Sequence, residues 1–163
     1  EQGRLALRRF AARDAESGAK PLAVETDFKF KVDDDVVIGR WDRIDERDGG
    51  IVLVDYKSSE VDDAEKAEAR AKASLKDGQL GLYALAYKEA RQVMPAAVEL
   101  RFVGTGVVGN AVVKDEHLER ARERVREAAA GIRAARYPAK PDQRNCGWCS
   151  YRMFCVHSAA KRT

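Results

Sequence analysis

The sequence predicts an α/β domain in which a mixed sheet is flanked by helices. Three strand-like runs follow one another in the first half of the chain, and a fourth stands alone between helical patterns in the second half. The length of 163 residues indicates a single domain that spans residues 1–163. The 45% hydrophobic fraction excludes a disordered chain. No apolar run approaches the roughly 18 residues that cross a bilayer, so we expect no membrane partner. A net charge of +3 is too small to indicate nucleic-acid binding by itself.

The first half of the chain is expected to form one helix and three strands, over residues 4–16, 23–30, 36–45 and 51–57. Leu7 and Phe10 stand near helical spacing, and turn signals rich in aspartate and glycine separate the strands. The third strand carries four apolar residues in succession from Ile51 to Val54. Such a run is typical of a central strand that is covered on both faces.

In the second half, residues 62–76 are expected to form an exposed helix or a mobile segment, and residues 79–93 a buried helix. A strand over 97–103 and a long amphipathic helix over 115–136 are expected to follow. The segment 62–76 has almost no large apolar residue, whereas the last helix bears an apolar stripe from Leu118 to Ile132. Two prolines then lead into a tail over 137–163 that holds every cysteine of the chain.

The Asp-Gly pair at 48–49 predicts a two-residue hairpin turn between the second and third strands. This turn places Asp42 directly across from Asp55, and Arg40 across from Lys57. Directly opposed residues have Cβ atoms about 4.5–5.5 Å apart. Because strand side chains alternate, Asp55 and Lys57 share one face of the sheet.

The sequence also allows other turns between the second and third strands. A turn on the Gly-Gly pair at 49–50 keeps the same side chains on one face, whereas a three-residue loop turns Asp42 away. Two facing carboxylates suit a hard cation such as Mg²⁺ or Mn²⁺, which polarises a phosphate and lowers the pKa of a bound water. Lys57 would then position that water or neutralise developing charge. The alternative is a surface hairpin with cross-strand salt bridges.

Cys146, Cys149 and Cys155 lie within the last eighteen residues. This clustering indicates metal ligation in a reducing compartment, which we expect to be the cytoplasm, more than a disulfide framework. A zinc-binding structural module with His157 as the fourth ligand is one alternative, although Cys155 and His157 are unusually close in sequence for two ligands of one ion.

Four motifs in this order resemble those of the RecB/AddB-type nucleases of the PD-(D/E)XK superfamily. They are Val24-Glu25, Gly39-Arg40-Trp41-Asp42-Arg43-Ile44, Asp55-Tyr56-Lys57 and Gln79-x-x-x-Tyr83. The spacing Cys146-x2-Cys149-x5-Cys155, after Tyr137-Pro138-Ala139, is similar to the iron–sulfur end of the AddB-like branch. The resemblance covers about residues 22–156 and implies a restriction-endonuclease-like αβββαβ core.

The resemblance also implies roles for individual residues. Asp42 and Asp55 would hold Mg²⁺ or Mn²⁺, and Lys57 would be the catalytic lysine. Glu25, at the edge of the same site, would be a further metal ligand. The implied partner of this site is DNA, beside a helix that carries Gln79 and Tyr83. Residues four apart share a helix face, which agrees with this placement. The alternative is that Tyr83 is a core aromatic.

The family further implies a nuclease domain, which we expect to be an exonuclease, attached to the motor of an ATP-dependent DNA helicase–nuclease acting in DNA repair and recombination. Cys146, Cys149 and Cys155 would be three ligands of a 4Fe–4S cluster, whose fourth cysteine would precede residue 1. The family's upstream Cys-Pro and G-x-x-x-H elements do not occur in this sequence. We therefore expect a piece of a longer protein, with weak or no activity alone. The alternative function is a DNA-binding module without catalysis.

Overall fold

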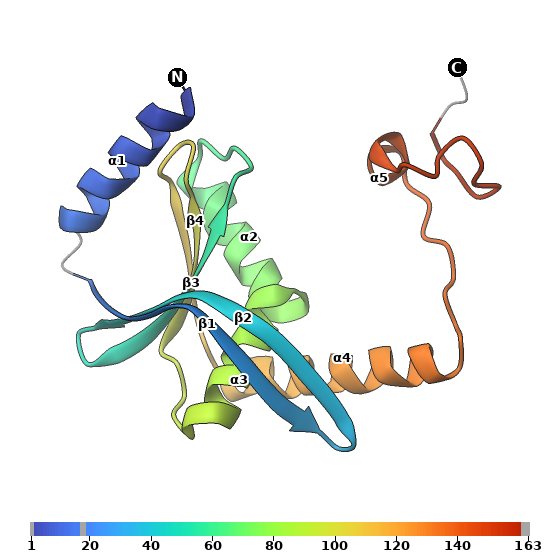
Figure 1. Ribbon diagram of the computed structural model, residues 1–163, viewed down its shortest axis with the longest axis horizontal. Helices are drawn as coiled ribbons and strands as arrows, with labels where there is room; N and C mark the ends of the chain where they lie inside the picture. Colours follow the sequence, from blue (N-terminus) through green and yellow to red (C-terminus); the bar gives the residue numbers. More distant parts are fainter. Residues whose placement is uncertain (1, 17–18, 161–163) are drawn as a thin grey trace. The chain divides into compact units, whose positions relative to one another are not determined.

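The computed structural model describes residues 2–16 and 19–160, and the chain divides into two compact units, Glu1–Glu127 and Ala128–Thr163. The elements that begin in the first unit are α1 (Gln2–Glu16), β1 (Lys20–Val32), β2 (Asp35–Arg47), β3 (Gly50–Lys57), α2 (Ala64–Asp77), α3 (Gln79–Arg91), β4 (Ala97–Phe102), β5 (Val108–Val112) and α4 (Asp115–Arg133) (Figure 1). The second unit contains the end of α4 and the short helix α5 (Gln143–Trp148).

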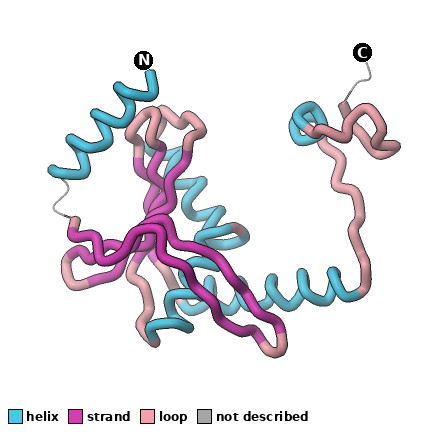
Figure 2. The backbone as a smooth tube through the Cα atoms, viewed as in Figure 1, coloured by secondary structure: helices cyan, strands magenta, loops and turns pink. Residues whose placement is uncertain are grey.

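One mixed sheet organises the first unit, with its strands in the order β1-β2-β3-β4-β5. All neighbours are antiparallel except β3 and β4, which are parallel from Val52↔Ala97 to Lys57↔Phe102. A parallel pair needs a long crossover, and α2 and α3 supply it between these two strands (Figure 2). The expected mixed sheet with flanking helices is confirmed.

The turn between β2 and β3 is the expected two-residue turn. Arg47 pairs with Gly50, so Asp48 and Gly49 form the loop, with φ angles of 49° and 75°. Two positive φ values are the signature of a type I′ turn, which glycine and aspartate tolerate better than most residues. The ladder then continues through Ile44↔Leu53. The register expected from the sequence is therefore confirmed in this part of the hairpin.

Two expectations for the second half were wrong or incomplete. The segment expected to be exposed or mobile forms α2, whose Ala67, Ala71 and Leu75 are buried. The small side chains of Ala67 and Ala71 bring the helix backbone so close to the sheet that a Cβ on Gly109 would clash with the Ala67 carbonyl oxygen. The strand β5 was missed, because its five residues include glycine and asparagine.

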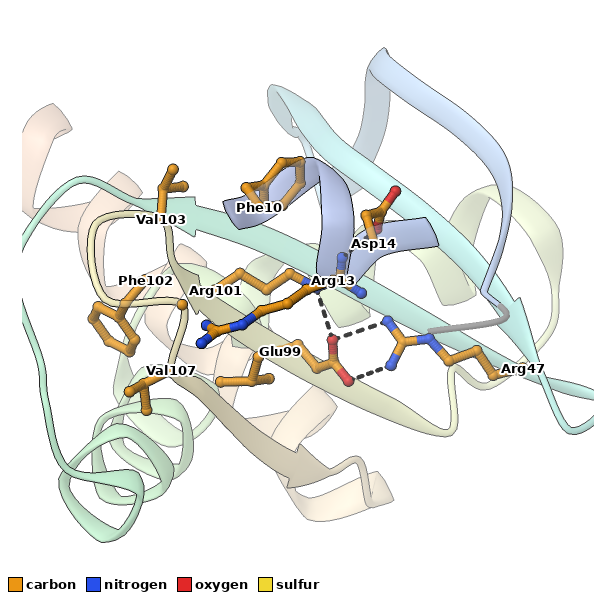
Figure 3. A pocket seen from close by; sticks show the side chains of 11 residues that line it. Phe10, Arg13, Asp14, Arg47, Glu99, Arg101, Phe102, Val103 and Val107 are labelled. Carbon is orange, nitrogen blue, oxygen red and sulfur yellow. Dashed lines mark hydrogen bonds and ion pairs between the residues drawn. The ribbon is translucent and has the colours of Figure 1, made fainter. Parts of the chain in front are cut away.

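The face of the sheet that α1 covers carries a network of buried ion pairs. In α1, Asp14 accepts hydrogen bonds from Arg43 of β2 at 2.7 and 2.8 Å and from Arg101 of β4 at 3.0 Å. Figure 3 shows Arg47 and Arg101 aimed at the carboxylate of Glu99 beside a cavity of about 170 Å³ under α1. Asp45, fully buried, completes the network through the same arginines.

This network predicts a loss of stability in acid. The hydrogen bond from Arg43 lowers the pKa of Asp14. Burial opposes ionisation of Glu99, but Arg47 and Arg101 still leave its pKa below its ordinary value. Carboxyls with lowered folded-state pKa values stabilise the fold above their unfolded pKa values, and this stability is lost as pH falls. We expect the free energy of unfolding, measured with urea, to fall steadily below about pH 4.5.

Replacing Asp14 by Asn should reduce that pH dependence and cost about 1.5–3 kcal/mol at pH 7, because hydrogen bonds to charged groups are lost. Asp34→Asn, in the exposed β1–β2 turn, is the matched control and should leave both the stability and its pH profile unchanged. Equal effects of the two substitutions would contradict this account of the network.

Candidate functional site

The site begins where β2 parts from β3. The last pair of their ladder is Arg43↔Val54, so Asp42 and Asp55 lie one step beyond it. Across this gap, the backbone N–H of Tyr56 donates to Oδ2 of Asp42 at 2.9 Å. The two carboxylates are near enough that the charge of Asp42 raises the pKa of Asp55.

The expected pairing of Arg40 with Lys57 is not formed, because the ladder has already ended. Arg40 instead donates to Asp27 across the β1–β2 hairpin, with 2.6 Å between Nε and Oδ1. The sequence pattern contained no signal for the divergence of β2 from β3, since both strands continue without a break.

Asp55 carries a carboxylate whose side chain is only 2% exposed. Burial is the main cause that raises its pKa, the charge of Asp42 adds to this, and Lys57 opposes it. The Lys57 ammonium lies 2.7 Å from Oδ2 of Asp55 and forms an ion pair with it. A buried carboxylate with a raised pKa, beside a second carboxylate, is a natural ligand for a cation.

Lys57 is also linked to α3. Its Nζ donates to Oε1 of Gln79 at 3.0 Å, and Nε2 of Gln79 lies 2.7 Å from the hydroxyl of Tyr83. Burial, together with the charges of Asp42 and Asp55, raises the pKa of Tyr83 to about 12. The phenol is therefore protonated at neutral pH.

The ring of Tyr83 packs in the core. It makes an edge contact with Phe28, with the ring centroids 5.9 Å apart, and its carbonyl accepts a hydrogen bond from Trp41 at 3.2 Å. Both interpretations of Tyr83 made from the sequence therefore apply: its ring is a core aromatic and its hydroxyl faces the site.

The structure brings five of the six predicted site residues together and leaves one apart: Asp42, Asp55, Lys57, Gln79 and Tyr83 are linked, and Glu25 is not. Glu25 has an exposed side chain whose carboxylate lies 3.6 Å from Arg40. Within the described ranges, no group of three or more histidine, cysteine, aspartate or glutamate side chains is placed to hold a metal ion. A cation between the two aspartates would take its remaining ligands from backbone, water or substrate.

Sequence reasoning missed the backbone N–H of Tyr56 as a part of the site. Main-chain donors leave no residue signature, so no motif could have indicated it. The Tyr56 side chain would not have helped either, since alternation places it on the sheet face opposite Asp55 and Lys57.

The cysteines of the second unit are free, and each is partly buried. Cys146 lies in α5, where its hydrogen bond with the backbone of Ala159 is the main cause that lowers the pKa of the thiol. The three cysteines do not converge as ligands among residues 2–16 and 19–160, alone or with His157. The iron–sulfur ligation and the zinc alternative are therefore not supported by the geometry of the tail.

Comparison with known proteins agrees with the fold. A family model described as the PD-(D/E)XK nuclease superfamily matches residues 1–156. A solved structure titled "Crystal structure of SSO0001" is similar to this chain with a TM-score of 0.55 and 14% identity, covering 96% of this chain and 69% of the other. This likeness confirms the restriction-endonuclease-like fold. No curated protein matches the chain, and no helix of the described part is long and apolar enough to cross a membrane.

The raised pKa of Asp55 predicts that its charge destabilises the fold when no cation is bound. A folded-state pKa above the unfolded value means that the folded protein binds the proton more tightly, so this contribution to stability falls as pH rises through that range. In a chelator at pH 7, Asp55→Asn should therefore raise the melting temperature.

The control is Asp62→Asn, an exposed aspartate in the loop before α2, which should leave the melting temperature within about 1 °C of the wild type. A lower melting temperature for Asp55→Asn would mean that the lost ion pair with Lys57 outweighs the relief of the buried charge.

Proposed function

The chain belongs to the PD-(D/E)XK nuclease superfamily, and on that premise we propose that it is a divalent-metal-dependent deoxyribonuclease that acts through Asp42, Asp55 and Lys57. The superfamily hydrolyses phosphodiester bonds. The observation that carries the proposal is the buried carboxylate of Asp55, held between the charges of Asp42 and Lys57 at the end of β3.

Asp42 and Asp55 are the residues that would hold Mg²⁺ or Mn²⁺. The donor set fits a hard cation, since both ligands are carboxylates and the side chain of Asp55 is buried beside that of Asp42. When bound, such a cation polarises the phosphate and lowers the pKa of a water molecule. Glu25 is not required by this arrangement. Glu25→Gln should keep the Mn²⁺ affinity if the two aspartates are the protein's main ligands.

The chain's own residues supply the remaining chemistry. Lys57, held by Asp55 and Gln79, presents an ammonium that orients the attacking water or neutralises charge that develops on the phosphate. Gln79 fixes the position of that ammonium from α3. The protonated phenol of Tyr83 holds Gln79 in turn, so the two helix residues are positioning groups for Lys57.

The biological role of the domain is inferred from its sequence motifs. We propose that the domain cuts DNA as an exonuclease fed by a helicase motor in the same protein, in DNA repair or recombination in the cytoplasm. The spacing of the motifs from Val24-Glu25 to Gln79-x-x-x-Tyr83 supports this setting. The non-catalytic alternative, in which the fold only holds DNA, is disfavoured by the presence of both aspartates and Lys57.

Lys57→Ala should reduce DNA cleavage by two or more orders of magnitude, because general acid–base and charge-stabilising groups typically contribute about 10²–10⁴-fold. DNA affinity should change little. Cleavage is measured on end-labelled DNA with Mn²⁺, and affinity by fluorescence anisotropy with Ca²⁺ in place of Mn²⁺. Lys29→Ala, which removes an exposed lysine of β1, is the charge-matched control. Parallel losses of binding and cleavage would instead make Lys57 a phosphate anchor.

For the tail we propose that Cys146, Cys149 and Cys155 bind a 4Fe–4S cluster together with a cysteine outside this sequence. The support is the spacing of the three cysteines. The measurement is iron and zinc analysis of the longer protein after anaerobic purification. About four irons per chain are expected, since such clusters usually take four thiolates. One zinc and no iron would contradict the proposal.

A further inference from the structure

Tyr56 connects the two faces of the sheet at the point where the site lies. Its backbone N–H donates to the carboxylate of Asp42 on the site's face. Its ring lies on the other face, where it meets the ring of Phe10 in α1 edge-on, with the centroids 5.4 Å apart and the planes at 85°.

The hydrogen bond to Asp42 replaces a missing part of the sheet. The ladder between β2 and β3 ends at Arg43↔Val54, so backbone pairing no longer sets the distance from Asp42 to Asp55. The Tyr56 amide spans this gap instead. Its direction is fixed by the peptide plane between Asp55 and Tyr56, which the ladder with β4 and the packing of the Tyr56 ring on Phe10 hold together.

The helix that holds this ring is itself well anchored. Asp14, one turn after Phe10, forms ion pairs with Arg43 and Arg101. Arg13 donates to the carbonyl of Thr105 at 3.3 Å. Figure 3 shows Phe10, Arg13 and Asp14 along the side of α1 that faces the sheet. None of these side chains touches the catalytic groups, but α1 contacts both sides of the gap: Phe10 meets the Tyr56 ring, and Asp14 pairs with Arg43, the residue that follows Asp42.

We propose that Phe10 and Tyr56 are positioning residues for the metal site, through which the docking of α1 holds the carboxylate of Asp42 at its place beside Asp55. The inference rests on the proposed function, because it takes the two aspartates as the cation ligands. It assigns to α1, on the face opposite the site, a role in metal affinity that goes beyond stabilising the fold.

The first test measures the hydrogen bond without any metal. Amide hydrogen exchange, followed by NMR on chain 1–163 in a chelator, should show the Tyr56 amide protected in the wild type. In Phe10→Ala, its protection should fall by about tenfold or more relative to the ladder amide of Val54, while Val54 keeps its protection. An unprotected Tyr56 amide in the wild type, or equal losses at both amides, would overturn the proposal.

The second test is the affinity for Mn²⁺, measured by titration calorimetry on the same chain. Phe10→Ala should raise the dissociation constant by about three- to tenfold. This change corresponds to the free energy that an aromatic edge contact typically contributes. Phe10→Tyr keeps the ring and should restore the wild-type dissociation constant. Leu118→Ala, a truncation of a buried leucine on α4, controls for loss of stability and should bind Mn²⁺ as the wild type does.

The outcomes separate this inference from the proposed function. Wild-type affinity in Phe10→Ala would overturn the inference alone, and so would an equal loss in Leu118→Ala. If the wild type bound no Mn²⁺ at all, the proposed function would fail and the inference with it.

Discussion

The carboxylate of Asp55 is buried near the end of the central strand β3, and the arrangement of the site follows from the cost of keeping a charge there. A buried ionised carboxyl needs hydrogen bonds, an opposite charge or a metal. Lys57 supplies one opposite charge, but Asp42 adds a second negative one. The site of the isolated chain is therefore left with more negative than positive charge, and this imbalance is what a divalent cation would correct.

The other face of the same sheet shows how the fold treats charges that have only a structural role. There the carboxylates of Asp14, Asp45 and Glu99 face the guanidinium groups of Arg43, Arg47 and Arg101, three against three. Glu99 is as deeply buried as many core residues, yet its pKa is lowered, whereas that of Asp55 is raised. Two buried acids on one sheet with opposite shifts distinguish a self-neutralised network from a site prepared for a ligand.

Much of the fold and of the candidate site could be predicted from the sequence, because it depends on interactions between residues that are near one another in the chain. The Asp-Gly turn set the register of β2 against β3, alternation placed Asp55 and Lys57 on one face, and the helical spacing of Gln79 and Tyr83 aligned their side chains. The features that escaped prediction depend on contacts between distant segments. The pairing of Arg40 with Asp27 instead of Lys57, the burial of the α2 alanines and the ring contact between Phe10 and Tyr56 are of this kind. The position of Glu25 also escaped prediction, because its carboxylate lies beside Arg40 instead of at the site.

One aromatic cluster explains why the two halves of the site meet. Asp42 comes from β2, whereas Gln79 and Tyr83 come from α3, and no backbone ladder joins these elements. The rings of Phe28 and Trp41 pack against Tyr83 and Tyr87, and Trp41 donates to the carbonyl of Tyr83. Because Trp41 immediately precedes Asp42, the packing that fastens the β1–β2 hairpin to α3 also fixes the separation between the carboxylate and the groups that hold Lys57. Core packing and site geometry are thus set by the same contacts, so a substitution in this cluster alters both together.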